Sequence, residues 1–266
     1  MFENKFSNIF LRKITGKGDA SFRSIIIILI KIEIDTHTHT DASSHAYSSY
    51  DEMIREAARI GLSGLAITNH APTLPDGPNE WHFNGITRLP KTVHGITVLY
   101  GSEVNILNYD GDMDLPDSLL QKLDIVIASM HSPAVPPSSE TEHTRGWLNI
   151  LDNPYVDILG HIGSTQYKCD YEQIAIKAAK NHKIIEINNH SFSVRPGSNE
   201  NCVTVMELCN KYRVPMVLSS DAHSLHDIAD YTHVIPLIEK LGIDRELILN
   251  RSIDKLKTFL KNRRQV

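Results

Sequence analysis

The stretch IEIDTHTHTDASSHAYSS, residues 32–49, places three histidines directly after an alternating apolar run that ends at Asp35. His37, His39 and His45 all fall within nine residues. Alternate residues of an extended segment share a face, so His37 and His39 should point the same way. The pattern predicts a strand that ends where a site for metal or acid–base chemistry begins.

Composition bounds the class of protein. The chain has 266 residues, of which 41% are hydrophobic and 22% are charged, and its net charge is −5. This is ordinary globular composition, and the length suits one large α/β domain or two small ones. The acidic balance argues against a binding surface for duplex nucleic acid. The three cysteines form no CxxC pair, which predicts reduced intracellular thiols.

The amino-terminal segment differs from the rest. Residues 1–24 are polar and lack a clear period, so we expect a poorly ordered extension, or an upstream start, before a single domain at 25–266. Six apolar residues follow at 25–30, far fewer than the roughly 20 that span a bilayer. They also lack the features of a signal peptide. We expect this run to lengthen the first strand or to cover an apolar surface, and we expect the protein to be cytoplasmic.

Short apolar runs recur along the chain and predict seven strands. They lie at 32–35, 64–68, 95–101, 123–129, 156–160, 183–189 and 214–220. Helical patterns occupy 50–61, 171–182, about 202–213 and about 253–262. Nearly continuous apolar runs are typical of parallel strands buried on both faces, and alternation with helices predicts βα units.

About seven βα units favour a seven-stranded α/β barrel related to the TIM barrel. An open, doubly wound sheet is the alternative. No GxGxxG follows the first strand, so a dinucleotide-binding fold has no support. Two Pro-rich stretches, 71–78 and 132–139, follow the second and fourth strands and predict long loops at one rim of the barrel.

Metal-ligand residue types follow nearly every predicted strand. They are His37, His39, His45, His70, Glu103, His131, His161, Asp221 and His223. In a βα barrel the carboxyl ends of all strands open onto one face, where active sites are built. Imidazole and carboxylate groups suit zinc, manganese and iron ions. Nine ligands exceed one tetrahedral ion and fit two or three ions with a shared carboxylate.

Three further residues are candidates for substrate binding. Arg195 follows the sixth strand on the predicted metal rim, and its guanidinium suits bidentate pairing with a phosphate. The helix expected from about Cys202 could add amide donors. His82 lies in the loop after the second strand, and His190 follows the asparagine pair of the sixth strand; both could line the pocket.

These motifs resemble a known family. DTHTHTDAS (35–43) and TNHAP (68–72) are similar to the opening of the PHP (polymerase and histidinol phosphatase) domain. The segments NEWHFN (79–84), GSEVNILNYDGDMD (101–114), SMHSP (129–133), EINNHSFSVRPGSNENC (186–202) and SSDAHS (219–224) resemble the YcdX-like bacterial phosphatases. The resemblance covers roughly residues 30–262. It implies a distorted (βα)7 barrel and three metal ions, usually zinc.

The resemblance also implies how the ligands are shared. One ion would be held by His37, His39, Glu103 and Asp221; a second by His45, His70 and His223; a third by Glu103, His131 and His161. Glu103 would therefore bridge two ions. The sequence departs from the family pattern before residue 30 and at His190, which puts the extension and the substrate contacts in question.

The resulting hypothesis is a phosphomonoesterase in which a metal-bound hydroxide attacks a small phosphate ester. Glu103 and Asp221 would fix the ion spacing and the position of the hydroxide. A phosphodiesterase or nuclease, a histidinol-phosphate phosphatase and a non-catalytic metal-binding scaffold remain alternatives. His and carboxylate sites accept manganese and iron as well as zinc, and no membrane partner is expected.

Overall fold

The computed structural model describes residues 30–263 and has seven parallel strands in a nearly closed barrel with helices between them. The strands are β1 (Ile34–Asp35), β2 (Gly64–Ile67), β4 (Ile96–Asn105), β5 (Ile125–Ser129), β6 (Ile158–Leu159), β7 (Ile184–Asn188) and β8 (Met216–Ser219). A short β3 (Thr92–Val93) pairs antiparallel with β4. The predicted (βα)7 barrel is confirmed. The expectations for residues 1–24 and for the run up to residue 29 lie outside the described residues.

The barrel is closed between β1 and β8 by contacts other than a ladder. An isolated parallel bridge joins Thr38 to Ala222 just beyond the two strands. Within the two strands, the buried amide of Asn250 donates to Ile34 O at 2.9 Å and to Leu218 O at 2.7 Å. Its Oδ1 accepts from Leu218 N at 3.1 Å. A side chain therefore satisfies backbone groups that a continuous ladder would have paired.

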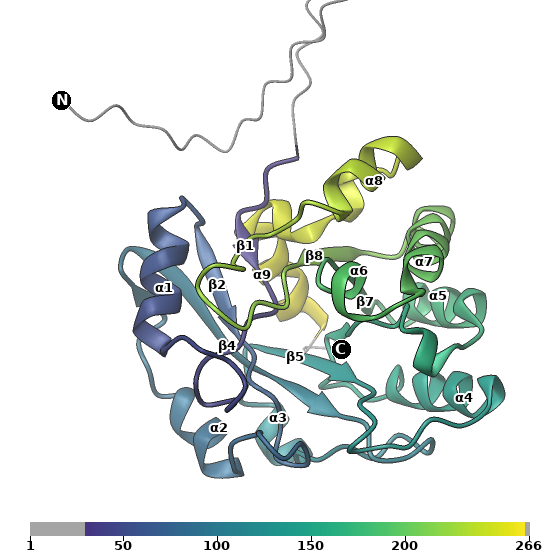
Figure 1. The fold of residues 1–266 in the computed structure, drawn as a ribbon, viewed down its shortest axis with the longest axis horizontal. Helices are drawn as coiled ribbons and strands as arrows, with labels where there is room; N and C mark the ends of the chain where they lie inside the picture. The colour runs from purple at the N-terminus through teal and green to yellow at the C-terminus, as the bar shows by residue number, and fades with distance from the viewer. Residues whose placement is uncertain (1–29, 264–266) are drawn as a thin grey trace, which may run out of the picture.

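Helices cover the outside of the barrel, as Figure 1 shows for α1 and α2 on one side and α4, α5 and α7 on the other. The helices of the described residues are α1 (Tyr50–Arg59), α2 (Glu80–Ile86), α3 (Asp117–Leu120), α4 (Glu140–Ile150), α5 (Tyr171–Lys180), α6 (Ser191–Val194), α7 (Ser198–Tyr212), α8 (Val234–Leu241) and α9 (Ile253–Arg263). Short 3-10 turns lie at Thr165–Tyr167, Arg245–Leu247 and Leu249–Arg251. Between residues 30 and 263, no helix has the length and apolarity that a membrane crossing requires.

Local sequence explains where these helices begin. A capping box between Ser49 and Glu52 starts α1, and its buried stripe includes Met53, Ile54 and Ala57. The prediction for α7 was wrong at its start: the helix begins at Ser198, four residues before Cys202. The preceding Gly197 is the N-cap of α7 and has a φ of 79°, a left-handed conformation that glycine adopts without strain.

The barrel interior forms an apolar core of its own. It contains Ile34, Ile158, Ile184 and the side chains of Leu256 and Leu260 from α9. A larger core fills the space between the outer faces of the strands and the surrounding helices. Because α9 packs against these interior residues, which begin strands β1, β6 and β7, it closes the amino-terminal end of the barrel.

The interior changes from apolar to polar toward the carboxyl end of the strands. In β4 the inward position moves from Leu99 to Glu103, and in β7 from Ile184 through Glu186 to Asn188. These residues are two or four apart and so share a face. The strands therefore hold polar side chains, buried among them, at the mouth opposite α9.

Candidate metal centre

Glu103 lies at the centre of the polar mouth. Its Oε2 is 2.9 Å from His70 Nδ1 and 3.3 Å from His37 Nε2. Its Oε1 is 2.8 Å from His161 Nε2 and 3.4 Å from His131 Nε2. All of these contacts reach a carboxylate that is 1% exposed. Each oxygen thus has two imidazole nitrogens within 3.4 Å, and His39 Nε2 lies 3.7 Å from Oε2. This is the arrangement expected of a carboxylate shared between two ions.

Asp221 forms a second acidic centre beside Glu103. Its Oδ1 lies 3.2 Å from His39 Nε2 and 3.6 Å from His37 Nε2. The backbone of Asp221 has a φ of 56°, and that of His161 has a φ of 31°. Non-glycine residues seldom adopt left-handed φ, and such conformations concentrate at functional sites. Each is the second residue after its strand, and the turned backbone aims its side chain into the mouth.

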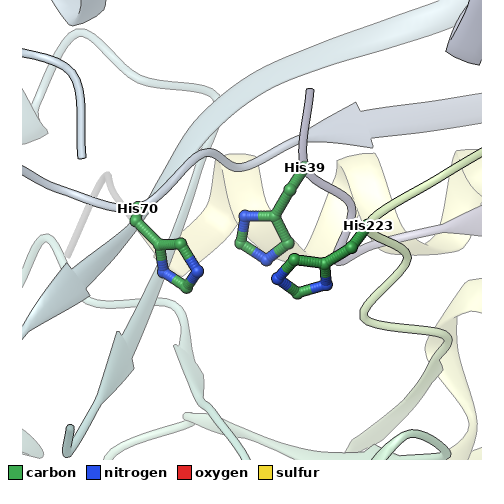
Figure 2. Close-up of side chains that lie close together, drawn as sticks. All are labelled: His39, His70 and His223. Carbon is green, nitrogen blue, oxygen red and sulfur yellow. The ribbon is translucent and has the colours of Figure 1, made fainter. Parts of the chain in front are cut away.

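The imidazoles from three separate loops converge, as Figure 2 shows for His39, His70 and His223. The ring centroid of His39 lies 4.3 Å from that of His70 and 4.4 Å from that of His223. The ring of His45 lies 4.4 Å from His223. Ligand atoms within 4.8 Å of one another form four groups: His39–His70–His223, His37–His39–Asp221, His45–His70–Asp76 and His70–Glu103–His131.

Several buried polar atoms in this cluster make no well-directed hydrogen bond, although His70 Nδ1 and Glu103 Oε2 lie only 2.9 Å apart. They are His37 Nε2, His39 Nδ1, both ring nitrogens of His70, and Glu103 Oε2. Buried polar groups in proteins are almost always satisfied, so such a concentration needs an explanation. Divalent cations bind imidazole nitrogen and carboxylate oxygen. The residues present therefore fit bound metal ions.

The pKa shifts of Glu103 and His37 also agree with bound metal ions. Burial raises the pKa of Glu103, but His37, His131 and His70 together hold it well below its ordinary value. Burial lowers the pKa of His37, yet Glu186, Asp221 and Glu103 raise it well above the ordinary value. Positive charge on the ring of His37 is thus favoured by the surrounding carboxylates. A metal ion would supply that charge.

Hydrogen bonds away from the centre orient the imidazoles. His131 Nδ1 lies 2.8 Å from the amide oxygen of Asn105, and His223 Nδ1 lies 2.9 Å from the carbonyl oxygen of Asp221. Each Nδ1 can therefore donate outward and leave Nε2 as a ligand, as is usual at metal sites. Asn105 is in turn held by Asp114, whose Oδ2 accepts from its amide at 2.6 Å.

Sequence reasoning missed three of these supporting residues: Asn105, Asp76 and Glu186. Asp76 Oδ2 lies 2.6 Å from His45 Nδ1, and Glu186 Oε1 lies 2.6 Å from His37 Nδ1. The signal for Glu186 was present, because an acidic residue interrupts the apolar run of β7. Asp76 lies in a Pro-rich loop that offered no such period.

The three predicted substrate-binding residues lie at the edges of the cluster. Arg195 Nη2 is 3.5 Å from Asp221 Oδ2, and Arg195 Nη1 donates to Ser191 Oγ at 3.0 Å. The ring of His190 lies 5.9 Å from that of His223. His82 Nε2 lies 3.3 Å from the amide nitrogen of Asn69, beside His70 in sequence. Their roles stay predictions, as do the nine ligand assignments.

Comparison with known proteins places the chain in a family. The model of the PHP domain matches residues 35–194. A protein of Clostridium botulinum (strain Hall) is 41% identical over 221 residues, which are 83% of this chain and 91% of the relative. A protein of Clostridium novyi (strain NT) is 41% identical over 223 residues, 84% of this chain and 91% of the relative. Both are described as "Probable phosphatase".

A solved structure shares the fold. Histidinol phosphate phosphatase from Lactococcus lactis subsp. lactis Il1403, complexed with zinc, L-histidinol and phosphate, superposes with a TM-score of 0.56 at 18% identity. The match covers 80% of this chain and 94% of that one. At this identity the similarity bears on the barrel alone.

Proposed function

Because the chain belongs to the PHP domain family, we propose that it is a metal-dependent phosphoric monoester hydrolase. The observation that carries the proposal is the position of Glu103, whose two oxygens each face two imidazole nitrogens within 3.4 Å. A buried carboxylate shared in this way suits a cluster of ions better than a single ion. The relatives described as phosphatases support the same reaction class.

We propose three zinc ions, with manganese and iron as substitutes of similar ligand preference. The ligand sets are His37, His39, Glu103 and Asp221; His45, His70 and His223; and Glu103, His131 and His161. The groups of converging ligand atoms agree with these sets in part, since they pair His37 with His39 and Asp221. They also group His70 with Glu103 and His131. His70 of the second set therefore lies close to ligand atoms of the third set.

Each group of the site has its own role in the proposed hydrolysis. Bound divalent ions would supply positive charge for the phosphoryl oxygens and make water more acidic. Glu103 and Asp221 would hold the spacing of the ligands. Arg195, which lies 3.5 Å from Asp221, would pair with a phosphate oxygen and stabilise the charge that develops during transfer. His82 and His190 would contact the alcohol portion of the ester.

A small monoester is favoured over a nucleic acid. The net charge is −5, and no basic cluster adjoins the strand-end motifs, so the steering expected for a polyanionic strand is lacking. Histidinol phosphate is the second candidate substrate. It is favoured by the shared barrel of the Lactococcus lactis enzyme, which binds zinc, L-histidinol and phosphate.

The test compares three esters on one enzyme preparation: p-nitrophenyl phosphate, its bis ester and histidinol phosphate. We expect turnover of the monoester to exceed that of the bis ester by at least about a hundredfold. Turnover of the bis ester alone would replace this proposal with a phosphodiesterase. If histidinol phosphate is hydrolysed much faster than other monoesters, the proposed activity is that of a histidinol-phosphate phosphatase.

A further inference from the structure

Glu186 is a buried carboxylate that the proposed reaction does not use. It lies on the inner face of β7 between Ile184 and Asn188. Its side chain is 0% exposed. A charged group at such depth is costly unless it is fully hydrogen-bonded. The groups that contact this carboxylate therefore indicate its role.

Four donors surround the two oxygens. Oε1 lies 2.6 Å from His37 Nδ1 and accepts from Ser219 Oγ at 2.6 Å. Oε2 accepts from the backbone N–H of His161 at 2.7 Å and from Asn188 Nδ2 at 3.3 Å. An ionised carboxylate offers about four acceptor sites and no donor. Every acceptor site of Glu186 is thus occupied, which leaves none for a metal ion.

The contact with His37 fixes which ring nitrogen faces the centre. A carboxylate only accepts, so Nδ1 must carry the proton that is shared with Glu186. Nε2 then faces inward, 3.3 Å from Glu103 Oε2 and 3.6 Å from Asp221 Oδ1. The tautomer of His37 is therefore set from outside the metal cluster.

The contact with His161 fixes a strained backbone. The residue has a φ of 31°, and its N–H donates to Glu186 Oε2. The ring of the same residue reaches Glu103 Oε1 at 2.8 Å. One carboxylate therefore holds residues from two of the proposed ligand sets, through the ring of His37 and the main chain of His161.

We propose that Glu186 is a positioning residue that sets the geometry of His37 and His161 and thereby the retention of two metal ions. The inference rests on the proposed function, since it needs ions at these ligands. A purely structural role would require only that the four donors be satisfied. The two roles differ in what a change at Glu186 does to metal affinity as distinct from folding stability.

Glu186→Gln tests the proposal because it preserves shape and replaces one acceptor oxygen by a donor. Whichever way the amide turns, its N–H groups meet either His37 and Ser219 or the His161 backbone and Asn188. The control is Ser219→Ala, which removes a donor from the same Oε1 without touching a proposed ligand. Metal content after dialysis against graded chelator is measured by elemental analysis, alongside thermal unfolding of each protein.

We expect Glu186→Gln to lower the affinity for two ions by about 10- to 100-fold, the usual effect of removing a partner of a metal-bound histidine. Ser219→Ala should stay within about threefold of the wild type, although both variants lose stability. Equal metal retention in the two variants would overturn the proposal. Should Glu186→Gln not fold, Glu186→Asp withdraws the carboxylate by one methylene, and wild-type metal affinity in that variant would also overturn it.

A double variant separates action through His37 from a general effect. In a His37→Ala background, Glu186→Gln should leave the affinity for the ion at His37 unchanged, because the residue through which it acts is gone. An undiminished further loss there would contradict the proposal. Failure of the proposed function is distinguishable, because a wild-type protein without ions or monoester hydrolysis would reject that function, whatever the variants show.

Discussion

His45 Nδ1 lies 2.6 Å from Asp76 Oδ2, and this contact joins the loop after β1 to the loop after β2. The side chain of His45 is 51% exposed, whereas that of Asp76 is 17% exposed. A second bond between the loops runs from Ser44 N to Asp76 O at 3.1 Å. The most exposed of the proposed ligands is therefore held by a carboxylate from a neighbouring loop.

Asp76→Ala should weaken binding of the ion at His45, His70 and His223 by about 10- to 100-fold, because His45 loses the partner that orients its ring. Chelator titration followed by elemental analysis measures this loss. Asp110→Ala serves as the control, since its exposed carboxylate contacts Arg145 and no proposed ligand. Identical titration curves for the two variants would contradict the orienting role of Asp76.

Glu103→Gln should reduce monoester hydrolysis by more than about a hundredfold and lower the metal content, because the neutral amide cannot serve two ions. Glu207→Gln on the exposed face of α7 provides the matched control and should behave as the wild type. Steady-state rates and metal content are measured on the same preparations. Full activity of Glu103→Gln would remove its assignment as the shared ligand.

His131→Ala should lower the occupancy of one metal site and remove most of the hydrolytic activity, while the protein stays folded. The side chain is 16% exposed at the mouth of the barrel, so its removal leaves no sealed cavity in the core. Circular dichroism and elemental analysis together measure both effects. Unchanged turnover would show that His131 is not a ligand.

Arg195→Lys should raise the inhibition constant of inorganic phosphate by about tenfold or more, since a charged hydrogen bond contributes about 1.5–3 kcal/mol. Lysine keeps the charge but cannot pair in a bidentate manner. Arg145→Lys on α4, whose partners are Glu142 and Asp110, is the control. The same inhibition constant in all three proteins would place phosphate binding elsewhere.

Asn250→Ala should lower the free energy of unfolding by about 3 kcal/mol or more, because three buried backbone groups between β1 and β8 lose their partner. Urea denaturation measures the change. The exposed Asn199 on α7 supplies the comparison, and Asn199→Ala should stay within about 0.5 kcal/mol of the wild type. A small effect at Asn250 would mean that the barrel seam is stabilised by other contacts.

The barrel and the convergence of its strand ends followed from periodicity. Continuous apolar runs such as 123–129 read as strands buried on both faces, and the residue after each strand was then assigned to one mouth. The short strand β3 was missed because two residues carry no period. The closing role of Asn250 was missed because it depends on the spatial neighbours Ile34 and Leu218, far away in sequence.

The residues that orient the proposed ligands were not predicted from the sequence. Glu186 reads as an interruption of an apolar strand, and only the fold shows that His37 lies opposite it, at a sequence separation of 149 residues. Asp76 lies in a loop whose proline and glycine content predicts a turn but no partner. Residue types at strand ends thus indicate the ligands, whereas tertiary contacts decide which groups orient them.

Metal-dependent hydrolysis at the barrel mouth can be tested by measuring bound ions and turnover on one sample while the ions are removed and then returned. The purified protein is analysed for metal, stripped with chelator, and reloaded with zinc or manganese, while hydrolysis of p-nitrophenyl phosphate is followed at each stage. We expect two to three ions per chain, loss of hydrolysis when the ions are removed, and recovery of hydrolysis on reloading. A folded protein that neither holds ions nor gains hydrolysis when they are supplied would contradict it.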